Sequence, residues 1–107
     1  MSRAKWQDRN VTSSPWIHNQ QQGLLSPVQI PQAFGAAVRT FRENAGMSQE
    51  TLAERADLDR TYVSGVERGV RNPTLRIINM LATALNVSEA ELFAEMARIR
   101  KKSSPKN

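Results

Sequence analysis

Arginine and hydroxyl side chains gather in one short stretch, between residues 59 and 76. The hydroxyl groups near the start of this stretch belong to Thr61, Tyr62 and Ser64. The arginines of this stretch are Arg60, Arg68, Arg71 and Arg76. A guanidinium can donate two hydrogen bonds to O6 and N7 of a guanine, or bind a phosphate. Hydroxyl groups bond to base edges and to the sugar-phosphate backbone. The stretch therefore has the groups needed to bind a nucleic acid, provided that a rigid element presents them on one face.

The spacing of apolar and capping residues predicts five short helices that would position this stretch. The expected first or capping residues are, in order, Pro31 or Gln32, Ser48, Asp59, Thr74 and Ser88. The expected stops are Gly46, the turn Asp57-Leu58, Gly69 and Asn86, with fraying of the last helix near Arg98. The helices that begin at Ser48 and Asp59 are joined by a tight turn, which predicts a helix-turn-helix.

Apolar residues predict which face of each helix is buried. The expected inward residues are Phe34, Ala37, Val38, Phe41, Ala45, Leu52, Ala53, Ala56, Val63 and Val66 in the first three helices. In the fourth helix they are Leu75, Ile78, Leu81, Ala82 and Leu85. The fourth helix has a second apolar stripe. The apolar face of the fifth helix consists of Leu92, Phe93, Met96 and Ile99, more than so small a core accommodates, and of these Leu92 is expected in the core. These predict a homodimer interface formed by Ile77, Met80, Phe93, Met96 and Ile99.

We expect the 107 residues to divide into a flexible N-terminal arm (1–31), a helix-turn-helix domain (32–98) and a basic disordered tail (99–107). The net charge of +5 is uneven. Residues 1–31 hold three cations and one acid, residues 32–97 hold seven arginines and nine acids, and residues 98–107 hold five cations. We interpret the arm as either a leader without a role or a segment that docks Trp16 or Leu24-Leu25 on the domain or a partner protein.

Catalysis and metal binding find little support in the sequence. The chain has no cysteine. Its one histidine, His18, lies in the arm, with no nearby acid or nucleophile to form a catalytic relay. Neither a metal site, a cofactor loop nor a membrane-spanning run is predicted. We therefore expect a non-enzymatic protein of the cytoplasm, without cofactor.

The order of residues resembles a known family. Residues 48–73 follow S-Q-x-x-L-A-x-x-A-x-L-x-x-x-x-V-S-x-V-E-R-G-x-x-x-P. F-x-x-x-V-R-x-x-R precedes this run, and L-x-x-I-x-x-L-A-x-A-L-N-V follows it. The pattern is similar to the Cro/C1-type (XRE) helix-turn-helix domain from about Phe34 to Phe93, with a five-helix, all-α, lambda-repressor-like fold. The run DRTYVSGVERGVRNPTL resembles restriction–modification controller proteins in particular, which usually lack an arm like residues 1–31.

The resemblance implies a role for individual residues. It places Arg60, Thr61, Ser64 and Tyr62 on base edges, with Tyr62 on either a phosphate or a thymine methyl. It places Gln49, Arg68, Arg71 and Asn72 on phosphates. A buried ion pair between Arg42 and Glu67 is also implied, and Gly65 stands where the family often has a reading side chain.

The function expected from these observations is a sequence-specific transcriptional regulator, activator or repressor, that binds a pseudo-palindromic operator in double-stranded DNA as a homodimer. An antitoxin-like interaction module, whose arm or tail binds a partner protein, is the alternative. A helix-turn-helix used only for protein contacts is a third hypothesis, which the negative balance of residues 32–97 suggests and the clustered arginines oppose.

Overall fold

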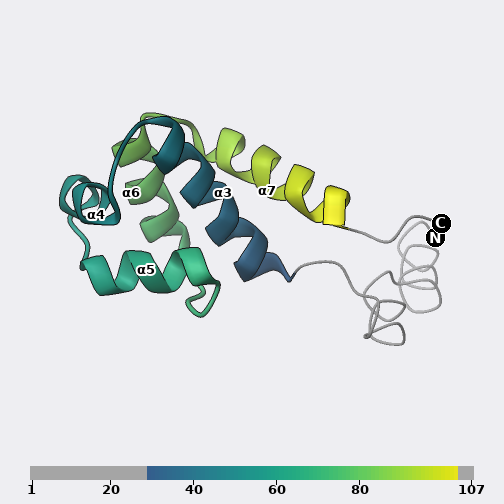
Figure 1. Cartoon of the computed structure of the whole chain (residues 1–107), viewed down its shortest axis with the longest axis horizontal. Helices are drawn as coiled ribbons and strands as arrows, with labels where there is room; N and C mark the ends of the chain where they lie inside the picture. The colour runs from purple at the N-terminus through teal and green to yellow at the C-terminus, as the bar shows by residue number, and fades with distance from the viewer. Residues whose placement is uncertain (1–28, 104–107) are drawn as a thin grey trace, which may run out of the picture.

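The fold comes from a computed structural model that describes residues 29–103 (Figure 1). This part of the chain forms five α-helices and no strand: α3 Ile30–Asn44, α4 Gln49–Ala56, α5 Arg60–Arg68, α6 Leu75–Leu85 and α7 Glu89–Ser103. The predicted all-α class and helix order are confirmed. The predicted arm lies outside the described residues up to residue 28, and so does the tail beyond residue 103.

Side-chain caps begin α4 and α7 as the sequence predicts. Ser48 Oγ accepts a hydrogen bond of 3.0 Å from the backbone N–H of Thr51. The N–H of Glu91 donates to Ser88 Oγ at 3.0 Å, and the N–H of Ser88 donates to the Glu91 carboxylate at 2.8 Å. Both pairs satisfy backbone donors that the first turn of a helix leaves free. Asp59 is different, because it takes the extended N-cap conformation without a side-chain hydrogen bond.

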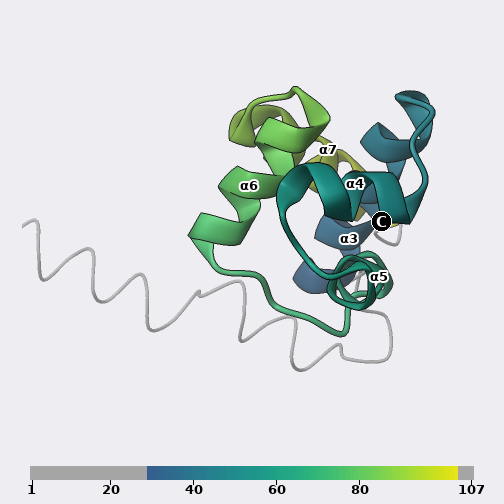
Figure 2. The ribbon, with the colours of Figure 1, turned by 90° about the vertical axis from the view of Figure 1, so that its left-hand side faces the viewer.

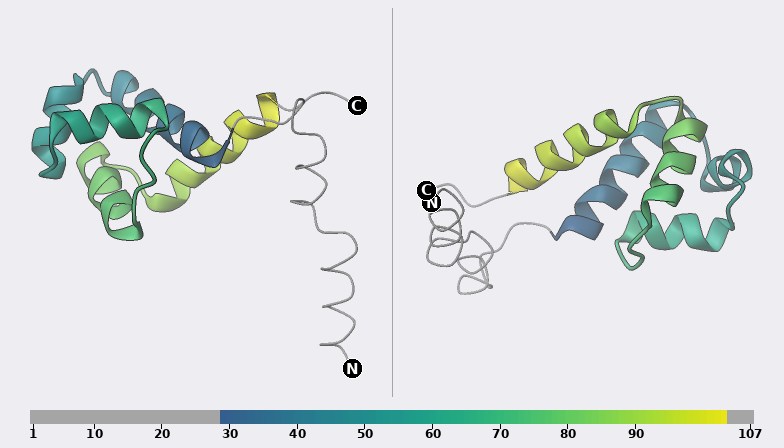
Figure 3. Two further views of the ribbon diagram at one scale, coloured as in Figure 1. Left: turned by 90° about the horizontal axis from the view of Figure 1, so that it is seen from below. Right: turned by 180° about the vertical axis from the view of Figure 1, so that it is seen from behind.

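The core lies where α3 packs against α5 and α7, and where α4 packs against α5 and α6 (Figures 1 and 3). Its largest fully buried side chains are Val38, Leu52, Val63, Val66, Leu81 and Leu92. All of these belong to the apolar stripes predicted from the sequence. Burial of such stripes is the main stabilising contribution available to helices this short.

Two residues expected in the core are exposed. Leu75 is 78% exposed, because it is the first residue of α6, directly after the capping residue Thr74, whose hydroxyl accepts from the N–H of Ile77. Ala45 follows the last turn of α3 and also faces solvent. Helical spacing predicted both positions inward, but each lies at the end of its helix.

Helix α7 continues to Ser103, which corrects both the expected fraying near Arg98 and the disordered tail from residue 99. Ile99 packs against the core cluster. One turn before the expected end, Arg98 Nη2 pairs with Glu95 Oε2 at 2.5 Å. The last turn carries Lys101 and Lys102, and cations there interact favourably with the helix dipole.

Helices α3 and α5 approach each other closely at Gly35. A Cβ atom placed on Gly35 would lie 2.1 Å from the carbonyl oxygen of Val66 and 2.7 Å from that of Glu67. Such distances are far below van der Waals contact, so the crossing needs a residue without a side chain. The sequence signal for this contact is a glycine inside a strong helical pattern, where glycine costs about 1 kcal/mol relative to alanine.

Candidate nucleic-acid interface

Helices α4 and α5 form the helix-turn-helix, and the turn between them fixes their angle. Asp57 takes the left-handed conformation, with φ 59° and ψ 45°. The N–H of Leu58 then donates to the carbonyl of Ala53 at 2.8 Å, which closes the end of α4. Figure 2 shows α5 nearly end-on beneath α4. One side of α5 is therefore packed against the domain, and the other faces away from it.

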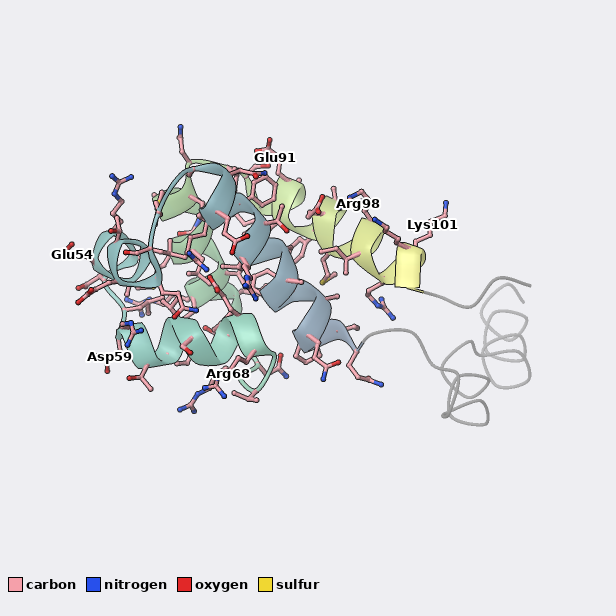
Figure 4. All side chains as sticks on the ribbon, in the orientation of Figure 1. Glu54, Asp59, Arg68, Glu91, Arg98 and Lys101 are labelled. Atoms are coloured by element: carbon pink, nitrogen blue, oxygen red, sulfur yellow. The ribbon has the colours of Figure 1, made fainter. Side chains whose placement is uncertain are left out.

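None of the candidate DNA-contacting residues of α5 belongs to the buried side of this helix. Val63, Gly65 and Val66 are buried. Arg60, Thr61 and Arg68 are exposed, whereas Tyr62 and Ser64 are half-buried. Figure 4 shows the Arg68 side chain extending from α5 away from the other helices. The structure thus presents cations and hydroxyl groups together along one helix, as direct reading of base edges requires.

The loop after α5 returns Arg71 to the surface of this helix. The guanidinium carbon of Arg71 lies 5.6 Å from the centroid of the Tyr62 ring, a cation–π contact. A Cβ atom on Gly65 would lie 2.7 Å from Cγ of Arg71. The stem of Arg71 therefore occupies the space that a side chain at position 65 would need. Sequence reasoning did not find this contact, because it joins a helix to an irregular loop.

Two further candidate residues, Arg68 and Asn72, lie on the same surface. Arg68 Nε donates to Ser64 Oγ at 3.4 Å, which joins two side chains one turn apart. Asn72 is exposed in the loop beside Arg71. The surface formed by α5 and residues 70–72 therefore brings together each exposed cation and amide that the sequence predicted there.

A hydrogen-bonded network holds α5 to α3 and to the start of α4. Arg42 Nε donates to Glu67 Oε2 at 2.6 Å, and Nη2 donates to Glu67 Oε1 at 3.0 Å. Arg42 Nη1 donates to the carbonyl of Met47 at 2.8 Å. The hydrogen bond to Glu67 raises the pKa of Arg42 above its ordinary value, although burial opposes that shift. The resemblance implied a buried ion pair between these two residues, and the structure shows it as a bidentate arginine–carboxylate pair.

Gln49 connects this network to the helix-turn-helix. Its Nε2 atom donates to Glu67 Oε1 at 2.9 Å, and the residue is half-buried at the first position of α4. One carboxylate of α5 therefore fixes both Arg42 and Gln49. The orientation of the Gln49 side chain at the start of α4 is therefore fixed by this hydrogen bond.

The residues predicted for a dimer interface lie on α6 and α7, which pack against each other. Phe93 is 36% exposed, and its ring lies 6.2 Å from that of Phe34. Ile77, Met80, Met96 and Ile99 are half-buried. These side chains are thus neither fully in the core nor fully in solvent.

Other kinds of site find no support in residues 29–103. Within that range, no group of three or more histidine, cysteine or acidic side chains is arranged to hold a metal ion. Nor does any helix in the described part of the chain have the length and apolar character needed to cross a membrane.

Comparison with known proteins agrees with this geometry. A family model described as helix-turn-helix matches residues 38–92, half of the chain. The chain belongs to the helix-turn-helix family. Control protein C.BamHI of Bacillus amyloliquefaciens is 47% identical over 61 residues, which is 56% of this chain and 75% of that protein. Control protein C.SmaI of Serratia marcescens is 44% identical over 64 residues, which is 60% of this chain and 76% of that protein.

Solved structures of helix-turn-helix regulators have the same fold. The restriction–modification controller protein C.AhdI of Aeromonas hydrophila superimposes with a TM-score of 0.58 at 52% identity, over 59% of this chain and 96% of that one. The controller protein C.Esp1396I, solved as a tetramer in complex with its natural 35-base-pair operator, gives a TM-score of 0.65 at 31% identity. That match covers 69% of this chain and 97% of C.Esp1396I.

Proposed function

We propose that this helix-turn-helix protein is a sequence-specific transcriptional regulator that binds a pseudo-palindromic DNA operator as a homodimer. The observation that carries the proposal is the surface of α5, where Arg60, Thr61 and Arg68 are exposed on a helix that is otherwise packed into the domain. The operator complex of C.Esp1396I supports it, because this chain covers nearly all of that controller protein. A protein of this kind acts in the cytoplasm, where it binds DNA rather than catalysing a reaction.

In the proposed complex, the N-terminal half of α5 enters the major groove. Arg60 and Thr61 lie at the start of the helix and contact base edges, with Ser64 one turn later. Tyr62 lies beside them against Arg71, where its ring can meet a phosphate or a thymine methyl. Sequence preference comes from these groups, because only base edges distinguish one base pair from another.

Phosphate contacts then fix the register of the helix in the groove. Gln49 is held at the first turn of α4 by Glu67. Arg68, Arg71 and Asn72 lie at the C-terminal end of α5 and in the loop that follows. Because Glu67 also belongs to the last turn of α5, the proposed phosphate contacts all lie near this end of the helix, and the base contacts lie near its start.

Base reading by Arg60 and phosphate binding by Arg71 predict different effects when each arginine is replaced. Arg60→Ala is expected to lower specific affinity by about 1–3 kcal/mol and to relax the preference at one base position per half-site. Arg71→Ala is expected to weaken binding to all sequences alike and to flatten the salt dependence. Selection of bound DNA from a random library, followed by sequencing, measures the first effect, and a salt titration measures the second.

Arg55→Ala provides the matched control, because Arg55 is an exposed arginine on α4 outside the proposed surface. It should leave both the selected sequence and the salt slope unchanged. A selected sequence that is the same for Arg60→Ala and for the parent would contradict base reading by Arg60.

A single α5 helix reads only a few base pairs, so two copies are needed for useful specificity. The half-buried apolar residues of α6 and α7 are the proposed contact between the copies. Pairing through this surface is expected to set the two α5 helices about one DNA turn, roughly 34 Å, apart.

Met96→Glu is expected to separate the dimer, because it places a charge in an apolar contact. Operator affinity should fall with dimerisation, while the monomer stays folded. Sedimentation equilibrium across micromolar concentrations measures the association, and circular dichroism measures the fold. Ala94→Glu is the control, because Ala94 is exposed and lies on the opposite side of α7 from Met96. A parent that stays monomeric throughout, or a Met96→Glu variant that stays dimeric, excludes this interface.

A further inference from the structure

We propose that Gly65 and Tyr62 are positioning residues for Arg71, and that together they hold its guanidinium in place before DNA binds. The inference rests on the proposed function, since the ligand of Arg71 is a backbone phosphate of the operator. It goes beyond that function because it assigns a role in phosphate binding to Gly65, a residue that has no side chain to contact DNA.

The backbone after α5 leads Arg71 back to this helix along a fixed path. Gly69 ends the helix in the left-handed conformation, with φ 79° and ψ 14°. The N–H of Val70 then donates to the carbonyl of Gly65 at 3.0 Å, and bonds of this kind close the end of a helix. Arg71 is the next residue, so its side chain starts from a backbone that is already bonded to α5.

Gly65 is buried by this loop rather than by the core. Helical spacing places it one turn after Thr61, which is exposed. The three atoms nearest to a Cβ at position 65 are Cγ and Nε of Arg71, at 2.7 and 3.4 Å, and Cγ2 of Val70, at 3.5 Å. The stem of Arg71 therefore lies along α5 in a space that stays open because residue 65 is a glycine.

The guanidinium at the end of this stem lies over the ring of Tyr62, 5.6 Å from the ring centroid. Tyr62 is half-buried and packs against the hydrophobic core, so its ring is a fixed surface. A cation–π contact depends on the charge of the guanidinium and uses none of its N–H donors. Arg71 is thus held at two points, with its stem at Gly65 and its charged group at Tyr62.

The N–H donors of Arg71 have no acceptor within residues 29–103, where the ring contact is the interaction that the structure gives this side chain. Arg42 and Arg39 differ, because both donate to carboxylates. A long side chain loses conformational entropy when binding immobilises it, and pre-organisation reduces that cost. Arg71 is already ordered with its donors unused, which favours binding of a phosphate.

Gly65→Ala tests this arrangement, because its methyl group needs the space of the Arg71 stem. The variant should stay folded, since arginine can take another rotamer and alanine is the better helix former. We expect its affinity for DNA to fall by about 2- to 10-fold for each bound subunit, the cost of ordering one long side chain. The loss should be equal for a duplex that the parent has selected from a random library and for an unrelated duplex, because phosphates carry no sequence information.

A double-mutant cycle with Arg71→Ala separates positioning from a direct effect of the methyl group. Fluorescence anisotropy measures the affinities, and circular dichroism measures the fold. In a protein that already carries Arg71→Ala, adding Gly65→Ala should change neither affinity. Three results would overturn the inference: no loss in Gly65→Ala, the same loss with and without Arg71, or a loss confined to the selected duplex.

The positioning can also be measured without DNA, from NMR order parameters of the arginine Nε–H groups. In the free parent, the order parameter of Arg71 is expected to exceed that of Arg55, an exposed arginine of α4. It should fall toward the Arg55 value in Gly65→Ala and in Tyr62→Leu. Equal values for the two arginines in the parent would overturn the inference. A parent that selects no sequence from the library would instead contradict the proposed function, and the order parameters would still decide whether Arg71 is held.

Discussion

Arg42→Ala is expected to lower the free energy of unfolding by about 3–5 kcal/mol. The side chains of Arg42 and Glu67 are only 11% and 4% exposed, and they share two hydrogen bonds. Without the guanidinium, the carboxylate of Glu67 stays buried. Of the partners in this network, Gln49 is then the one that still donates a hydrogen bond to it. The carbonyl of Met47 loses its side-chain donor at the same time. The cost arises mainly from the uncompensated buried charge.

Urea denaturation of the parent and the variant measures this effect. Arg39→Ala is the matched control, since it removes an arginine from the same helix and breaks the Arg39–Glu43 pair. That pair is 64% and 54% exposed, and exposed pairs contribute about 0.2–1 kcal/mol. If Arg42→Ala costs no more than Arg39→Ala, the Arg42–Glu67 pair is solvated and does not hold α5 to α3.

The same network links stability to DNA binding. Glu67 positions Gln49, so a variant that disturbs the carboxylate also releases the side chain proposed to contact a phosphate at the start of α4. Because the phosphate contact carries no sequence information, the released Gln49 would weaken binding without changing base preference. Affinity and stability should therefore fall together in Arg42→Ala, whereas Arg60→Ala should change affinity alone.

Much of the fold follows from local sequence signals. Val38, Leu52 and Leu81 lie at helical spacing, and each is fully buried. The caps at Ser48 and Ser88 also follow from residue type, since a hydroxyl group beside a free backbone donor has few better partners. Signals of this kind are reliable because each depends on residues within a turn or two of one another.

What the sequence could not predict depends on contacts between distant elements. Leu75 has a core-like spacing, but it is the first residue of α6 and its side chain is exposed. The stacking of Arg71 on Tyr62 depends on how the loop after α5 returns to the helix. Helix α7 continues past Arg98 to Ser103, and Ile99 packs against the core, a contact that the polar character of the last residues did not indicate.

Gly35 shows the same limit, and it leads to the second large prediction. Alanine is intrinsically better than glycine in a helix by about 1 kcal/mol, so propensity alone predicts that Gly35→Ala stabilises the protein. The structure predicts the opposite. The new Cβ atom would lie 2.1 Å from the carbonyl oxygen of Val66. This oxygen belongs to the backbone, so it cannot relieve the clash by changing rotamer as a side chain could.

Helix α3 must therefore move away from α5 by about 1 Å in Gly35→Ala, and overpacking of this kind costs about 3 kcal/mol at the upper end of its usual range. The displacement also stretches the hydrogen bonds between Arg42 and Glu67, so the two costs add. Gly46→Ala is the control, because Gly46 has a φ of +71° but nothing within 4 Å of a Cβ atom. Its backbone strain should cost about 1–2 kcal/mol. Thermal and urea unfolding of both variants measure these costs. If Gly35→Ala is as stable as the parent, the backbone of α5 does not lie within 2.1 Å of a Cβ atom at position 35, and the prediction is wrong.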